Sequence, residues 1–193
     1  MARIPLDPPR TLTYRLTEWY SRRRFGAVAD PAAAMGHNTR VLVTDARHEM
    51  SLQKWHRLDP TLKALAVMAS AVGIGCSWCV DFGYWTSSQR GVDPAKLRAV
   101  PHWRDSDVFT DLERQAMGYA EAVTATPPAV TDEMVAGLRR HLDDAALVEL
   151  TMMIAVENQR SRFNSALGLT SQGFKDRCEL PAPPVRVQEA RAS

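Results

Sequence analysis

Recurrent start signals of α-helices are the feature that most restricts the fold of this chain. Asp59-Pro60 and Asp93-Pro94 each place an N-cap residue before a proline at the first helical position. Thr110-Asp111-Leu112-Glu113 has the form of a capping box, in which the threonine and the glutamate each satisfy a backbone N–H group. The period-two alternation of apolar residues that is typical of strands is nearly absent. The chain is therefore predicted to be all-α.

The same signals place the individual helices. The expected helices cover residues 11–24, 32–50 with a break at 37–38, 60–72, 76–87, 94–99, 110–124, 131–142 and 143–167. The first of them carries Leu12, Leu16, Trp19 and Tyr20. The last should bury a stripe formed by Leu147, Leu150, Ile154 and Phe163.

The length of the chain favours a single domain. A chain of 193 residues can bury one substantial core, whereas two small domains would each be marginal. We expect a helical N-terminal extension at 1–25, an all-helical domain at 26–180 and a flexible, proline-rich tail at 181–193.

Charge and hydropathy exclude several classes of partner. Lysine and arginine number 24 against 22 acidic residues, and Arg22-Arg23-Arg24 is the one tight basic run, so no nucleic-acid partner is expected. No apolar run reaches eighteen residues, and Met1-Ala2-Arg3-Ile4-Pro5 does not resemble a signal peptide. A cytoplasmic protein without a membrane partner is therefore expected.

The run Cys76-Ser77-Trp78-Cys79 is the pattern that points to chemistry. Gly73-Ile74-Gly75 ends the preceding helix, so the cysteine pair should open a new one. The N-terminus of a helix favours a thiolate over a thiol, and the thiolate is the form that attacks peroxides and disulfides. In a reducing cytosol such a pair is more consistent with catalysis than with a fixed cross-link. Cys76 and Cys79 are therefore the candidate catalytic residues, and Trp78 either covers them or simply packs.

Other interpretations of the pair require partners elsewhere in the chain. A structural zinc site needs four ligands, and the remaining cysteine is Cys178. Haem attachment would need a histidine at position 80, which is Val80. We therefore expect no metal and no cofactor, although two buried cysteines acting as small apolar residues remain an alternative. The histidines show no paired ligand spacing; they are His37, His48, His56, His102 and His141.

These features together resemble the carboxymuconolactone decarboxylase family, and within it the AhpD-like alkylhydroperoxidases. The resemblance covers about residues 24–168. It depends on the motif at 75–81, Gly-Cys-Ser-Trp-Cys-Val-Asp, after a capped apolar helix and a glycine turn. The segments 148–151 and 157–164 are similar to a later helix of the family.

The resemblance implies an all-α, homo-oligomeric protein with an AhpD-like helical bundle. It further implies that the dithiol reduces a hydroperoxide or a disulfide and is then reduced by an unidentified thiol. Carried over from the family, Cys79 attacks the peroxide and Cys76 resolves the product. The helix terminus by itself favours Cys76 as the thiolate, and we expect Cys76 to be exposed to the external reductant.

The chain departs from the family at its proton relay. The family pairs a glutamate on the preceding helix with a histidine one turn after the second cysteine, and these positions are Ala64 and Gly83 here. Neither side chain can move a proton, so other groups would have to replace them. Asp81 is interpreted as a surface carboxylate because position i+2 points away from Cys79, and Tyr84 is a poor base at neutral pH.

More distant residues could also contribute to the site. Those expected on helices are His37, His48, His56, Glu149, Glu157 and Arg162. Asn158, Arg162 and Asn164 are expected to make structural hydrogen bonds or subunit contacts.

Three functions follow from these observations. The first is a thiol-dependent oxidoreductase acting through Cys76 and Cys79. The second is a lyase of the decarboxylase type, which would not need both cysteines. The third is a helical module that has lost its chemistry, suggested by Ala64 and Gly83.

Overall fold

A computed structural model describes residues 1–177, and within them every regular element is helical. The all-α prediction is confirmed. The tail predicted at 181–193 and Cys178 lie outside the described residues. The elements are α1 (Leu12–Phe25), α2 (Asp30–Met35), α3 (Thr39–Leu52), α4 (Pro60–Ile74), α5 (Ser77–Gln89), α6 (Pro94–Ala99), the 3-10 helix η1 (Val100–Asp105), α7 (Asp111–Thr124), α8 (Asp132–Arg139), α9 (Asp144–Ala166) and the 3-10 helix η2 (Lys175–Arg177).

The helix starts are determined by local capping, as the sequence predicts. Asp59 accepts a hydrogen bond from the Leu62 N–H at 2.9 Å, and Asp93 accepts one from the Ala95 N–H at 2.7 Å. The capping box of α7 is formed in full. These bonds satisfy N–H groups that would otherwise lack a partner in the first turn.

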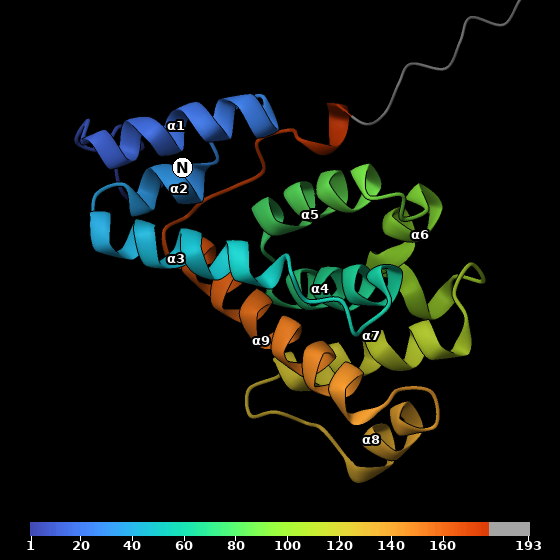
Figure 1. The fold of residues 1–193 in the computed structure, drawn as a ribbon. Helices are drawn as coiled ribbons and strands as arrows, with labels where there is room; N and C mark the ends of the chain where they lie inside the picture. The colour runs from blue at the N-terminus through green and yellow to red at the C-terminus, as the bar shows by residue number, and fades with distance from the viewer. Residues whose placement is uncertain (178–193) are drawn as a thin grey trace, which may run out of the picture.

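Helix α4 lies at the centre of the fold and packs against α5, α7 and α9 (Figure 1). Leu65 of α4 and Leu150 and Ile154 of α9 are fully buried in the shared core. The predicted stripe of α9 is therefore correct at these two positions, whereas Leu147 and Phe163 are only partly buried. Leu65, Leu150 and Ile154 belong to one hydrophobic core, as expected for a single domain.

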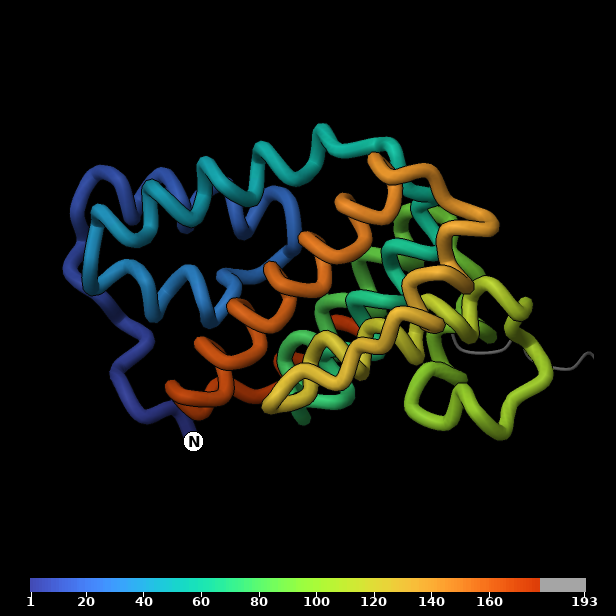
Figure 2. Tube along the Cα trace, turned by 90° about the horizontal axis from the view of Figure 1, so that it is seen from below, coloured from blue at the N-terminus to red at the C-terminus, as the bar shows by residue number. Residues whose placement is uncertain are grey.

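The two ends of the described chain return to this bundle. The Arg3 N–H donates to the Leu167 carbonyl at 2.8 Å, which places the N-terminus beside the end of α9 (Figure 2). After α9, the segment 170–177 runs past α5 and α1 (Figure 1). The boundary predicted between 1–25 and 26–180 stays a prediction. Among residues 1–177, no helix has both the length and the apolar character to cross a bilayer.

Candidate active site

The junction between α4 and α5 places both cysteines at a helix N-terminus. Gly75 ends α4 with φ of 79°, a left-handed conformation that side chains disfavour. Cys76 is the N-cap of α5, and its sulfur accepts the backbone N–H of Cys79 at 3.2 Å. The predicted position of the pair is confirmed. This N–H group and the helix dipole both favour negative charge on the Cys76 sulfur.

Cys76 and Cys79 form a disulfide and are buried. Their Cα atoms are 5.3 Å apart, and the residues are 2% and 7% exposed. The expectation that Cys76 is an exposed sulfur is therefore wrong for the oxidised protein. Cys76 does line a cavity of about 360 Å³. The other lining residues are Val72, Gly75, Ser77, Val80, Asp81, Ser171 and Lys175.

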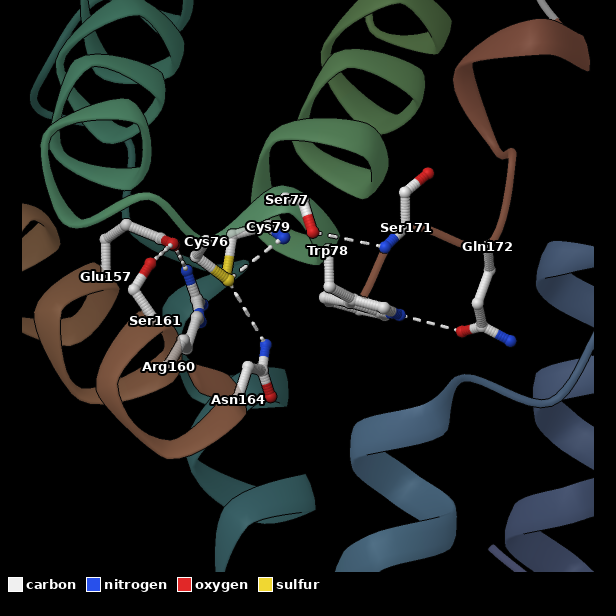
Figure 3. Close-up of a disulfide and its surroundings, with 10 residues drawn as sticks. All are labelled: Cys76, Ser77, Trp78, Cys79, Glu157, Arg160, Ser161, Asn164, Ser171 and Gln172. Carbon is white, nitrogen blue, oxygen red and sulfur yellow. Dashed lines mark hydrogen bonds and ion pairs between the residues drawn. A yellow bond between two sulfur atoms is a disulfide. The ribbon is translucent and has the colours of Figure 1, made fainter. Parts of the chain in front are cut away.

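Asn164 of α9 is the polar side chain that contacts both sulfurs (Figure 3). Its Nδ2 lies 3.3 Å from the Cys79 sulfur and 3.8 Å from the Cys76 sulfur. Its Oδ1 is buried and has no hydrogen-bond partner. The sequence predicts a structural hydrogen bond or a subunit contact for Asn164, and it does not reveal the place of this side chain at the disulfide. Asn158 does have the expected structural role, because its Nδ2 donates to Ser70 and Thr124 at 3.0 and 2.9 Å.

Glu157 lies on the same face of α9 as Asn164. Its carboxyl group is buried, since the residue is 3% exposed. It accepts a hydrogen bond from the Ser161 hydroxyl at 2.8 Å and one from Arg160 at 3.4 Å. Arg160 is bound more closely to Glu49, at 2.7 and 2.6 Å. Burial raises the pKa of Glu157 to about 7, although Arg160 and Ser161 act in the opposite direction.

Asp81 is buried and not a surface carboxylate, so that interpretation is corrected. It is 2% exposed and accepts the backbone N–H groups of Gln172, Phe174 and Lys175 at 2.8, 3.0 and 2.7 Å. Burial raises its pKa, but these bonds and one from the Ser171 side chain outweigh burial, so the pKa lies below its usual value. Asp81 thus anchors the 170–177 segment to α5.

An aromatic cluster covers the other side of the cysteine pair. Trp78 stacks on Phe82 with ring centroids 4.8 Å apart, and the fully buried Phe174 packs edge-on against Phe82 at 5.1 Å. The Trp78 indole N–H donates to Gln172 at 2.7 Å (Figure 3). Trp78 therefore both packs and connects the cysteine loop to the 170–177 segment.

An apolar side chain lies against Gly83, one of the two positions at which the resemblance places a proton relay. A Cβ atom at Gly83 would lie 2.9 Å from the sulfur of Met68, which is 1% exposed. A histidine at position 83 would therefore require Met68 to move. Tyr84 is turned toward α6, where its hydroxyl accepts a hydrogen bond from Arg98 at 3.2 Å.

The other distant candidates lie away from the disulfide. His37 and His56 are exposed and bond to backbone carbonyls of Pro5 and Lys54, each at 2.8 Å. Glu149 pairs with Lys63. Arg162 donates to Thr126 at 3.1 Å. Within residues 1–177, no three His, Cys, Asp or Glu side chains are grouped to hold a metal ion.

Comparisons with known proteins agree with this architecture. The model of the "Carboxymuconolactone decarboxylase family" matches residues 42–122. The uncharacterized protein YnjA of Escherichia coli K12 is 36% identical over 171 residues, which are 88% of this chain and 92% of YnjA.

Two solved structures share the fold at low sequence identity. An uncharacterized peroxidase-related protein of Ralstonia eutropha JMP134, described as an alkylhydroperoxidase AhpD core, superposes with a TM-score of 0.79 at 17% identity, covering 94% of this chain and 98% of its own. The debrominase Bmp8 in complex with 2,3,4-tribromopyrrole superposes with a TM-score of 0.78 at 19% identity, covering 92% and 97%. At these identities the likeness shows the fold alone.

Proposed function

Because the chain belongs to the carboxymuconolactone decarboxylase family and has an AhpD-like fold, we propose that it is a thiol-dependent oxidoreductase that reduces a hydroperoxide or a disulfide. The observation that carries this proposal is the cysteine pair itself. Cys76 and Cys79 are bonded to each other at the N-terminus of α5, where backbone N–H groups and the Asn164 amide favour a thiolate.

The reduction of a hydroperoxide would take two steps. The Cys79 thiolate attacks the terminal oxygen of ROOH, the O–O bond breaks, and the alkoxide leaves as ROH after taking up a proton. Cys79 is then a sulfenic acid. The Cys76 thiolate attacks its sulfur, the S–O bond breaks, hydroxide leaves and takes up a proton to become water, and the disulfide forms.

An external thiol would return the protein to its reduced form. The cavity beside Cys76 gives this reductant an approach to that sulfur. Attack on Cys76 forms a mixed disulfide and releases the Cys79 thiolate. A second thiol of the reductant then displaces Cys76, so two electrons enter for each peroxide or disulfide reduced.

Serine variants of the two cysteines test this proposal. In a Cys178→Ser background, the reduced protein is mixed with cumene hydroperoxide, and its thiols are counted over time. Cys79→Ser should abolish turnover, whereas Cys76→Ser should stop at a Cys79 sulfenic acid that dimedone traps. The matched control is the Cys178→Ser protein, which should form one disulfide for each peroxide. Undiminished turnover by Cys79→Ser would disprove the proposal.

The same samples separate the alternatives. Decarboxylation that survives Cys76→Ala/Cys79→Ala would favour the lyase. Two slowly reacting thiols that form no disulfide in mild peroxide would favour a non-catalytic module. 2,3,4-Tribromopyrrole belongs among the substrates assayed, because the debrominase Bmp8 shares the fold.

We also propose that the protein is a homo-oligomer that associates through α1. Leu12, Leu16, Trp19 and Tyr20 form one apolar face of this helix and are 83, 64, 60 and 49% exposed. Such a face is stabilised when a second copy covers it.

Light scattering after size-exclusion chromatography measures this association. We expect the wild type to be larger than a monomer, and Leu16→Glu/Trp19→Glu to be a monomer because it would bury two charges. Val148→Glu, an exposed apolar position on α9, is the control. A monomeric wild type, or dissociation by Val148→Glu alone, would contradict an α1 interface.

A further inference from the structure

The dithiol lacks the family's proton relay, yet one face of α9 brings polar side chains to it. Glu157, Ser161 and Asn164 are spaced by four and three residues, so they share one face of the helix. All three are buried, at 3, 0 and 1% exposure. They project from α9 toward the start of α5, where the disulfide lies (Figure 3).

Asn164 is the residue of this face that contacts the sulfurs. Its Nδ2 donates to the Cys79 sulfur at 3.3 Å, which leaves its buried Oδ1 without a partner. A buried acceptor without a donor is costly. The contact that Asn164 makes with Cys79 is through its Nδ2, a donor that stabilises negative charge on that sulfur (Figure 3).

Ser161 lies between Glu157 and Asn164 on this face of the helix. It lies about one turn from each, and its hydroxyl already donates to the Glu157 carboxylate at 2.8 Å. A hydroxyl that donates one hydrogen bond can still accept another. The Ser161 hydroxyl can therefore accept a proton from another group while it passes its own proton to Glu157.

The charges around Glu157 leave it able to exchange a proton near neutral pH. Arg160 faces it but is bound mainly to Glu49 of α3, and Asp45 and His48 lie on that same helix. Arg160 therefore compensates the Glu157 charge only in part. Burial, which Arg160 and Ser161 offset only in part, raises the pKa of Glu157 to about 7.

We propose that Glu157 is the proton acceptor and donor of the Cys76–Cys79 dithiol, with Ser161 carrying the proton between them. This inference rests on the proposed function. It assigns to Glu157 and Ser161 the proton transfer that Ala64 and Gly83 cannot carry out. The Cys79 thiol loses its proton through Ser161, which leaves Cys79 as a thiolate and Glu157 as a neutral acid. When the O–O bond of the peroxide breaks, Glu157 returns that proton to the alkoxide, which leaves as ROH.

The pH dependence of dithiol oxidation tests the role of Glu157. The reduced protein is oxidised by cumene hydroperoxide between pH 5 and 9, and in parallel its thiols are alkylated by iodoacetamide. In the wild type both rates should rise through a step near pH 7, as Glu157 ionises and becomes able to accept a proton. In Glu157→Gln the step should vanish, and oxidation at pH 8 should be about 10²-fold slower.

Two further variants separate a proton path from a structural effect. Ser161→Ala retains Glu157 and should also slow oxidation, but less. Glu149→Gln changes another buried glutamate of α9, one that pairs with Lys63, and should match the wild type.

The outcomes distinguish this inference from the proposed function. If Glu157→Gln keeps the wild-type rate and pH step while Cys79→Ser is inactive, Glu157 is not the proton acceptor and the oxidoreductase stands. If the wild type is not oxidised by any peroxide or disulfide, the proposed function fails. The alkylation profile then still decides whether Glu157 controls the dithiol.

Discussion

Replacing Asp81 with asparagine is expected to lower the free energy of unfolding by about 3 kcal/mol. The carboxylate accepts three backbone N–H groups from the 170–177 segment. The amide of asparagine would present an N–H group to some of these donors and would remove the negative charge that strengthens the bonds. Phe174, fully buried beside Trp78, would lose the anchor that holds its backbone.

Urea denaturation with tryptophan fluorescence measures this loss, and the rate of disulfide reduction by dithiothreitol should increase because the segment opens more often. Asp93→Asn is the matched control. Asp93 is an exposed N-cap that accepts one N–H group, and asparagine caps helices equally well, so its effect should stay below about 0.5 kcal/mol. Equal losses of unfolding free energy in the two variants would show that Asp81 does not anchor the 170–177 segment.

The low pKa of Asp81 adds a pH dependence with a defined sign. A carboxyl group whose pKa is lower in the folded state stabilises the fold above its unfolded pKa. The stabilisation by Asp81 should therefore be present at neutral pH and lost as the pH falls below the ordinary value of 3.8. The difference between wild type and Asp81→Asn should shrink accordingly in acid.

Glu157 should produce a pH dependence of the opposite sign. Its pKa is about 7 in the folded protein against the ordinary 4.5 of a glutamate, so the folded state binds the proton more tightly. Stability then falls as the pH rises from 4.5 to 7, by about 1.4 kcal/mol per pH unit and about 3 kcal/mol in total. Glu157→Gln should remove this fall.

Urea denaturation of the oxidised protein between pH 5 and 8 measures the effect without titrating the thiols. The quantity to compare is the difference in unfolding free energy between wild type and Glu157→Gln, which should decrease up to about pH 7 and then level off. Glu149→Gln is the control, because bonds from Lys63 and Arg57 outweigh burial and hold the pKa of Glu149 below its usual value. Its difference from wild type should be constant above pH 5, and a constant difference for Glu157→Gln as well would disprove the raised pKa.

The helices could be predicted from sequence because their ends depend on neighbouring residues. The caps at Asp59, Asp93 and Thr110 act on N–H groups two or three positions away, and all three are formed as predicted. The position of Cys76 and Cys79 follows for the same reason, since Gly75 and the next helix turn are adjacent to them.

The environment of the cysteines could not be predicted in this way. The position of Asp81 relative to Cys79 does not reveal its burial, because its hydrogen-bond partners lie 91 to 94 positions later in the chain. Asn164 is 85 positions from Cys79. A spacing signal did exist, because residues 157, 161 and 164 share a helix face, but it does not reveal which element that face meets.

The all-α fold and the CxxC pair at a helix start follow from the sequence, because capping, glycine termination and helical periodicity are local properties of the chain. The position of Met68 against Gly83, and the approach of Glu157, Ser161 and Asn164 from α9 to the start of α5, depend on tertiary packing. Burial, buried acceptors without a donor and shifted pKa values arise where distant segments of the chain pack together. Helix α9 reaches the cysteines only through the packing of the whole bundle.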